Sequence, residues 1–398
     1  MEASNYPLAL SLPLEKTRLI FVDLLRGWAI LVMIETHVFN AMIVPGLKET
    51  TLFDILSFIN GMVAPSFLFV SGFVFFVSSR RKIGDFRRFG AAFWKQMGRM
   101  ALIWFIAYGL HLPSFSFKRM FTETTAEGWL KFYQVDILHC IVAGWLFLLF
   151  CLIFIRSEVF YRRWMTVSGL VTVFVTPFLS GTDLNQFFPA PISAYFNGQH
   201  YSIFPLFPWL GFMILGGLTA SLYVKAMSEG YQKQFMIRLA LIAASLVALS
   251  SLLSLIPLQV EYASTGWRDN PLFFFIRFGV VLLLLATCWY YADRWDTRSR
   301  QGAGSAGILD VSRESLFVYV AHLLIIYGKY SDDKSFEQTY GKTFSTVECL
   351  FASLGLAVLM SLTARYWSWL KGRSRTASRA ISYAVAAAAV IIFFIKES

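Results

Sequence analysis

The sequence predicts an all-α, polytopic integral membrane protein, a helix bundle with about 10–11 transmembrane helices. Of its 398 residues, 57% are hydrophobic and only 15% are charged, whereas a soluble globular protein has about 25% charged residues. The mean hydropathy is +0.59. A soluble core cannot bury this much apolar surface, so the lipid bilayer is expected to solvate it.

A transmembrane helix needs about 20 consecutive, predominantly apolar residues. Eleven segments approach this requirement, and the third and the last are the shortest. In chain order they are 19–43, 52–78, 99–113, 136–155, 164–180, 203–224, 237–256, 271–292, 308–328, 346–369 and 380–395. No cleavage-type pattern of small residues follows the first segment, so it is predicted to be a retained helix and not a signal peptide.

The basic residues are distributed unevenly between the two sides of this topology. Of the 35 Lys and Arg, 23 fall on the side of the N-terminus and 9 on the other, and Arg26, Arg277 and Arg365 lie within spans. Cytoplasmic loops carry the excess of positive charge, so the N-terminus is predicted to be cytoplasmic. The net charge of +11 is therefore mostly topological and does not indicate a nucleic-acid partner. A bacterial inner membrane is the expected location.

Three regions are predicted: a cytoplasmic tail over 1–18, a transmembrane domain over 19–369, and a basic loop with a possible extra helix over 370–398. No soluble second domain and no short-period repeat is found. The four cysteines lie far apart in apolar stretches without metal-ligand spacing, so they are predicted to be buried thiols, and no metal is expected. They are Cys140, Cys151, Cys288 and Cys349.

The first span contains four ionisable residues, which are costly inside a membrane and are therefore functional candidates. Arg26 and His37 are eleven positions apart, about 20° beyond three full turns of an α-helix. Their side chains are predicted to share one stripe, about 16 Å apart along the axis. Asp23 lies one turn before Arg26 and Asn40 one turn beyond His37, whereas Glu35 faces the opposite side. This stripe must face protein or water, and it can connect the two faces of the membrane.

None of the five histidines is predicted to lie at the cytoplasmic face. His37 lies past the midplane, His322 near mid-depth of the ninth span, His111 and His139 at outer helix ends, and His200 in an outer loop. A general base that works in the outer half would come from this group, because histidine titrates near neutrality. Structural or interfacial roles remain open for the three outer histidines.

A basic run follows the second span and allows two interpretations: a solvated cytoplasmic loop, or a site for the phosphates of a coenzyme. It comprises Arg80, Arg81, Lys82, Arg87, Arg88, Lys95 and Arg99. Within that span, Ser71 and Gly72 are a weaker signal, because small residues also allow helices to pack closely.

Several short motifs resemble signatures of the integral membrane acyltransferases. They are Asp23-Leu24-Leu25-Arg26-Gly27 followed by His37, Phe67-Leu68-Phe69-Val70-Ser71-Gly72-Phe73, and Ser315-Leu316-Phe317-Val318-Tyr319-Val320-Ala321-His322. Two others resemble the branch that contains heparan-α-glucosaminide N-acetyltransferase and its bacterial relatives. These are Asp136-Ile137-Leu138-His139 and Phe207-Pro208-Trp209-Leu210-Gly211. The resemblance covers spans one to ten in the expected order.

The resemblance implies an enzyme that moves an acyl group, usually acetyl from acetyl-CoA, onto a hydroxyl or amine of a glycan or glycolipid. It makes His37 the catalytic histidine, acting as base or nucleophile, and Arg26 its motif partner. The lysosomal member places its reactive histidine differently, so His37 follows the bacterial O-acyltransferase pattern. No esterase-like domain is appended.

In this interpretation the coenzyme phosphates lie near Arg80, Arg81, Arg87 and Arg88. His322 joins the catalytic residues, and Tyr319 helps it to close the site. Asp23, Ser71 and His139 are expected to support the catalytic site. Membrane lipids are the expected surroundings, and oligomerisation is left open. The alternative is a non-enzymatic transporter or flippase of lipid-linked sugars that uses the stripe as its path. A purely structural subunit would leave the stripe unexplained.

Overall fold

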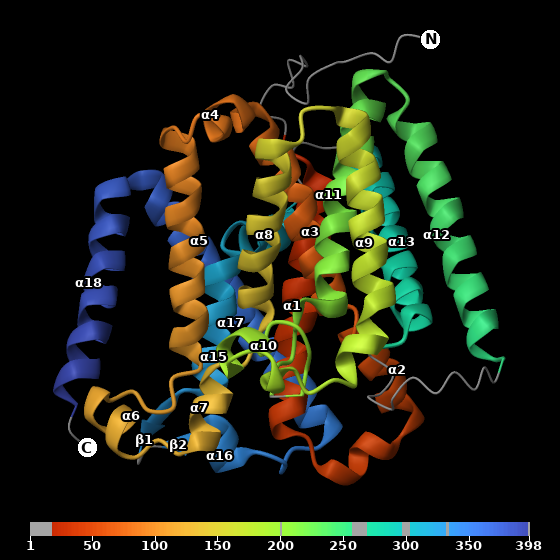
Figure 1. Ribbon diagram of the computed structural model, residues 1–398. Coiled ribbons are helices and arrows are strands. Elements are labelled where there is room, and N and C mark those ends of the chain that lie inside the picture. The colour runs from red at the N-terminus through yellow and green to blue at the C-terminus, as the bar shows by residue number, and fades with distance from the viewer. Residues whose placement is uncertain (1–17, 200, 257–268, 297–302, 332–333, 397–398) are drawn as a thin grey trace. The chain divides into compact units, whose positions relative to one another are not determined.

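The computed structural model describes residues 18–199, 201–256, 269–296, 303–331 and 334–396 (Figure 1). Residues 1–17 of the predicted tail over 1–18, and His200, lie outside the described residues. The described chain is helical apart from loops and one small hairpin, in which β1 (Lys329–Ser331) pairs antiparallel with β2 (Lys334–Ser335). The predicted all-α class is confirmed.

The chain divides into two compact units. The first comprises Leu68–Ala286 with both chain ends, and the second comprises Leu19–Phe67 with Thr287–Ile391. The helices α3 (Val63–Ser79), α13 (Pro271–Asp296) and α18 (Arg375–Ile395) each contribute to both units.

The first unit is built around α11 (Leu206–Ser228), which packs along α9 (Glu158–Ser180) and α8 (Ile137–Phe154). Its remaining elements are η2 (Arg80–Lys82), α4 (Ile83–Arg87), α5 (Ala91–Leu110), α6 (Phe117–Thr122), α7 (Ala126–Phe132), η3 (Leu184–Gln186), α10 (Ala190–Ser193) and α12 (Gln232–Ser254).

Two glycines let the backbones of α3 and α11 touch. A Cβ added at Gly72 would lie 2.0 Å from the carbonyl oxygen of Met213, and one at Gly216 would lie 2.2 Å from that of Phe69. Small residues at such crossings allow the close approach that stabilises helix pairs in membranes. Helix packing is therefore a role that Gly72 fulfils.

The second unit is built around α1 (Ile20–Met42), which packs against α14 (Ala303–Arg313), α15 (Ser315–Tyr327) and α17 (Thr346–Arg373). It also contains η1 (Pro45–Glu49), α2 (Thr51–Asn60) and α16 (Phe336–Tyr340). A Cβ at Gly27 would lie 2.7 Å from the carbonyl oxygen of Ile308, so glycine is needed where α1 crosses α14. At its other end, α1 packs in an apolar cluster with Ile326 and Cys349.

Seven helical stretches among the described residues are long and apolar enough to cross a membrane, so the chain is an integral, multi-pass membrane protein. They are Thr51–Arg87, Ile137–Phe154, Leu206–Ser228, Gln232–Ser254, Pro271–Arg294, Thr346–Arg373 and Arg375–Ile395. The predicted spans 19–43, 99–113 and 164–180 are helical but are not among the seven. The predicted span 308–328 is two helices, because the helix breaks at Glu314 between α14 and α15.

Candidate active site

Two histidines predicted from separate motifs meet in the second unit. His37 projects from α1 and His322 from α15, and their ring centroids lie 5.2 Å apart. His322 is completely buried, whereas His37 is partly exposed. Tyr327 lies next to His37, with its hydroxyl 3.5 Å from Nδ1 and 3.4 Å from the backbone oxygen of His37.

The hydrogen bonding of His322 defines which ring nitrogen is free. Its Nδ1 lies 2.7 Å from the carbonyl oxygen of Val318, one helical turn earlier. A carbonyl only accepts hydrogen bonds, so Nδ1 carries the proton and Nε2 keeps its lone pair. Nε2 is buried and has no hydrogen-bond partner among the described residues. Such orphaned buried atoms are uncommon, and a site for a ligand is one explanation for them.

Tyr319 of the late motif contacts this pair, whereas Glu35 of α1 does not. The ring of Tyr319 contacts that of His322, with centroids 5.8 Å apart, and its role in closing the site stays a prediction. Glu35 lies apart from the pair and accepts a 3.5 Å hydrogen bond from Asn60 of α2. The histidine pair and Tyr319 thus form one cluster.

Arg26 lies in a separate polar network at the other end of the α1 stripe. Its Nη2 donates to Asp23 at 2.7 Å and its Nε donates to Ser312 of α14 at 2.9 Å. The hydroxyl of Ser312 also lies 3.4 Å from the Asp23 carboxylate, so the three side chains form a closed triangle. The structure brings Arg26 together with Asp23, its neighbour one turn earlier on the predicted stripe, and not with His37.

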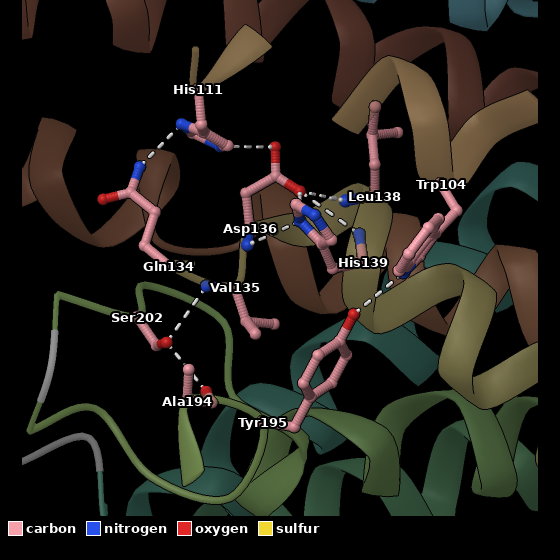
Figure 2. Close-up of polar contacts among 10 residues, drawn as sticks. All are labelled: Trp104, His111, Gln134, Val135, Asp136, Leu138, His139, Ala194, Tyr195 and Ser202. Carbon is pink, nitrogen blue, oxygen red and sulfur yellow. Dashed lines mark hydrogen bonds and ion pairs between the residues drawn. The ribbon is translucent and has the colours of Figure 1, made fainter. Parts of the chain in front are cut away.

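A second cluster forms in the first unit around Asp136, the residue that precedes α8 (Figure 2). Its Oδ1 lies 2.9 Å from Nδ1 of His139, and its Oδ2 lies 3.2 Å from Nε2 of His111, at the end of α5. Oδ1 also accepts the backbone N–H groups of Leu138 and His139, so Asp136 caps α8. The side-chain nitrogen Nε2 of Gln134 lies 2.7 Å from the other ring nitrogen of His111, Nδ1.

This cluster combines a buried carboxylate with an oriented imidazole. Burial by itself would raise the pKa of the Asp136 carboxyl, but hydrogen bonds from His111 and His139 and their charges outweigh burial and hold it below its ordinary value. The Nε2 of His139 is buried and has no hydrogen-bond partner among the described residues. The ligand atoms of His111, Asp136 and His139 lie within 4.8 Å of one another, so this donor set could also hold a divalent cation.

The loop before α11 is fixed to the start of α8. The hydroxyl of Ser202 accepts the backbone N–H of Val135 at 3.0 Å and donates to the backbone oxygen of Ala194 at 2.7 Å. Tyr195 accepts a hydrogen bond from the indole of Trp104 on α5 at 3.1 Å (Figure 2). These contacts position the loop segment that carries Asp136.

The arginines of the basic run after α3 differ in their contacts and burial. The Arg87 guanidinium donates to the carbonyl oxygens of Leu152, Ile153 and Ile155, at 3.3, 3.2 and 2.9 Å, and so satisfies the C-terminal end of α8. Arg88 is exposed and donates to the carbonyl of Gly84 at 3.2 Å. Arg80 is half-buried and Arg81 is exposed. A structural role for Arg87 is visible in these contacts, and a phosphate site remains a prediction for the run.

Ser71 lies in α3, where its backbone oxygen accepts the indole N–H of Trp145 at 3.4 Å. The sequence prediction included neither His111 nor Ser312 among the site residues. Asp136-x-x-His139 was a readable signal for the helix cap, because an acceptor at the N-cap with a polar residue three positions later is typical of a capping box. No local signal connects His111 to Asp136, 25 residues later.

The fold defines a polytopic membrane protein whose helices hold buried imidazole and carboxylate groups. The family model described as heparan-alpha-glucosaminide N-acetyltransferase, catalytic, matches residues 18–260, which is more than half of the chain. The protein belongs to this family and is an N-acetyltransferase-like membrane enzyme. The match includes His37 and the Asp136 cluster and ends before Tyr319 and His322. The comparison with curated proteins finds no match.

Proposed function

We propose that this protein transfers an acyl group, in the first place acetyl, from acyl-CoA to a hydroxyl or amine of a glycan or glycolipid. The family supports the acetyltransferase class. The observation that carries the proposal is the His37–His322 pair, in which a buried imidazole keeps an Nε2 lone pair without a partner among the described residues, beside a second, partly exposed imidazole. An oriented imidazole of this kind is suited to remove a proton during acyl transfer.

The transfer forms a bond between the acceptor oxygen or nitrogen and the acyl carbonyl carbon and breaks the carbon–sulfur bond of the thioester. Histidine takes the proton from the acceptor as it attacks, and that proton leaves with the coenzyme thiolate. Alternatively, His37 attacks first, because imidazole is itself a nucleophile: its ring nitrogen bonds to the acyl carbon as the carbon–sulfur bond breaks and the coenzyme thiolate leaves. The acceptor then attacks that carbon, the nitrogen–acyl bond breaks, and His322 takes the acceptor's proton. Tyr327, at 3.5 Å from Nδ1 of His37, would orient the ring in both routes.

The test separates catalysis from stability. His37→Ala is expected to lower transfer from radiolabelled acetyl-CoA to a glycolipid extract by about 10²–10⁴-fold per folded molecule, the range for loss of a general base. His322→Ala should also lower transfer per folded molecule. Glu35→Gln, on the same helix but away from the pair, is the matched control and should retain transfer. A folded His37→Ala protein with near wild-type turnover would refute the assignment and leave His322 as the candidate base.

The orientation belongs to this proposal, with the N-terminus in the cytoplasm and the protein in a bacterial inner membrane. The basic run would then meet cytoplasmic acyl-CoA. Gly84→Cys, which has nothing within 4 Å of its added Cβ, should be protected from a membrane-impermeant thiol reagent in intact cells. Phe187→Cys in the outer loop, at a side chain 70% exposed, should react. The reverse labelling pattern would invert the topology.

The alternative function, a transporter or flippase of lipid-linked sugars, makes a different prediction. It requires the polar stripe as a path but consumes no acyl-CoA. Release of the coenzyme thiol that depends on an added glycolipid acceptor would favour the enzyme, and its absence from the purified, folded protein would favour the transporter. The family favours the enzyme.

A further inference from the structure

A charged cavity lies between α17 and α18 in the second unit. It has a volume of about 310 Å³ and is lined by Trp367, Lys371, Arg375, Ser378, Arg379 and Ser382. The lining residues of α18 recur at intervals of three and four positions, so they lie on one face of that helix. Trp367 and Lys371, four positions apart on α17, form the opposite wall.

The cations of this cavity outnumber their internal partners. Lys371 donates to Glu314 at 2.5 Å, which neutralises one positive charge. Neither Arg375 nor Arg379 makes a side-chain hydrogen bond or an ion pair with any residue that the structure describes. Both arginines belong to the first turns of α18, where the helix dipole adds further positive potential. Two like charges four positions apart repel each other on a helix, so an anion between them would be stabilising.

The donors available indicate a phosphate group as the ligand. Ser378 and Ser382 donate their hydroxyl protons to helix carbonyls at 3.1 and 3.0 Å. These small side chains therefore leave room for a ligand in the cavity but offer it no hydrogen-bond donor. The guanidinium groups remain, and their forked N–H groups match phosphate oxygens. The ammonium group of Lys371, on the opposite wall, is already paired with Glu314, so the two arginines carry the charge left uncompensated by the described residues.

The surroundings favour a phosphate that belongs to a lipid. The helix α18 has 21 residues, which corresponds to a length of about 31 Å and therefore to the hydrocarbon thickness of a bilayer. Beyond the arginines it exposes large apolar side chains, including Ile381, Tyr383 and Val385 at 44%, 73% and 65%. Acyl chains can lie along this surface while the headgroup occupies the cavity at the membrane boundary.

We propose that the cavity between α17 and α18 binds the headgroup phosphate of an anionic phospholipid through Arg375 and Arg379. Basic pockets between transmembrane helices near the cytoplasmic surface bind such headgroups in other proteins. The proposal does not depend on acyl transfer, because none of these residues belongs to the histidine pair or to the basic run after α3.

The test measures lipid binding to the full-length protein in detergent by native mass spectrometry, with phosphatidylglycerol as the probe and phosphatidylcholine as the neutral comparison. The double variant Arg375→Gln/Arg379→Gln should bind phosphatidylglycerol about 25-fold more weakly, from about fivefold for each arginine near a charged lipid surface. Glutamine is a good helix former, so folding is expected to persist.

The matched control is Arg373→Gln, which removes one charge two positions before the cavity. Arg373 lies over the ring of Trp369, at 5.3 Å, and does not line the cavity. It should retain wild-type binding, and single Arg375→Gln should lose about fivefold. Equal losses of phosphatidylglycerol affinity in Arg373→Gln and Arg375→Gln would show that general surface charge, and not the cavity, causes the effect. This result would overturn the proposal. Tight binding of inorganic phosphate or coenzyme A that excludes phosphatidylglycerol would also overturn it, because the pocket would then serve a soluble ligand.

Discussion

Replacing Asp136 tests whether one carboxylate holds both the start of α8 and the imidazoles around it. Its Oδ1 accepts two backbone N–H groups, at 2.9 and 3.2 Å, and contacts His139 Nδ1 at 2.9 Å. Its Oδ2 contacts His111 at 3.2 Å. Asp136→Ala removes all four contacts, whereas Asp136→Asn keeps an oxygen that can cap the helix, because Asn and Asp are equivalent N-caps.

The expected losses of stability follow from these contacts. Loss of an N-cap costs about 0.5–2 kcal/mol, and an imidazole N–H left buried and unpaired costs about 1–3 kcal/mol. Asp136→Ala is therefore expected to lose about 2–4 kcal/mol, since coupled contacts do not add fully. Asp136→Asn should lose about 1 kcal/mol, the difference between a hydrogen bond to a charged and to a neutral acceptor.

Thermal unfolding in detergent, followed with a thiol-reactive fluorophore, measures these differences. Cys140, one turn into α8, is completely buried and reacts only when the helix opens. Ser157→Ala is the control, because Ser157 caps α9 with one exposed hydrogen bond of 3.3 Å and no charge. It should lower the melting temperature less than Asp136→Ala. Equal melting temperatures for Asp136→Ala and the wild type would show that the cluster does not stabilise the fold.

The same pair of proteins has a defined pH dependence. Because the pKa of Asp136 is held below its ordinary value in the folded protein, its stabilising charge is fully present above the ordinary pKa, about 3.9. It is lost as the pH falls through the lower folded-state pKa. The difference in stability between the wild type and Asp136→Asn should stay constant from pH 7 to about pH 4 and narrow below it. If this stability difference already narrows between pH 7 and 5, its pH dependence would come from a histidine and not from the Asp136 carboxyl.

Two further predictions concern helix packing and the basic run. Gly72→Ala should strongly destabilise the protein, because its Cβ would lie 2.0 Å from the backbone oxygen of Met213, whereas Gly98→Ala, with nothing within 4 Å, should be neutral or slightly stabilising in the same thermal assay. Arg87→Gln should lower the melting temperature by removing the donors to the end of α8. Arg88→Gln should leave the melting temperature unchanged. If the basic run binds coenzyme phosphates, Arg88→Gln should also raise the KM for acetyl-CoA with kcat unchanged.

Helical periodicity was sufficient to predict the polar stripe of α1, because eleven residues return a side chain to nearly the same face of a helix. It could not tell which stripe residues act together. The structure pairs Arg26 with Asp23 and Ser312, and it pairs His37 with His322, 285 positions later in the chain. The second pairing was accessible only through the late motif, because a single sequence without a resemblance carries no information about such distant contacts.

The sequence prediction was least accurate where tertiary contacts change the meaning of a residue. The apolar run 308–328 was predicted to be one span, but the chain breaks at Glu314, which pairs with Lys371. No signal in the sequence indicates that Arg87 donates to the carbonyl oxygens that end α8, and its predicted part in a phosphate site stays a prediction. In both cases a charged side chain within or beside an apolar segment satisfies a distant group, which hydropathy cannot detect.

The two ends of the α1 stripe differ in how completely their polar atoms are satisfied, and this difference predicts different roles for Arg26 and His37. At one end, Arg26, Asp23 and Ser312 bond to one another at 2.7–3.4 Å. At the other, the contact between His37 and Tyr327 is 3.5 Å long, and Nε2 of His322 has no described partner. Polar groups that satisfy one another hold a fold together, whereas unsatisfied ones are available to a substrate.

Arg26→Gln should therefore lower stability by about 2–4 kcal/mol, because it removes the ion pair that Arg26 makes with the largely buried Asp23 carboxylate, while transfer per folded molecule is retained. The double variant Asp23→Asn/Arg26→Gln removes both charges of the ion pair and should recover part of that stability, since the charge that lost its Arg26 partner is removed as well. Thermal unfolding and acetyl transfer from radiolabelled acetyl-CoA, measured on the same preparations, separate the two properties. A double variant that regains stability yet transfers no acetyl would place Arg26 in the transfer site beside His37 and refute the structural role, because recovered folding would then fail to restore the chemistry.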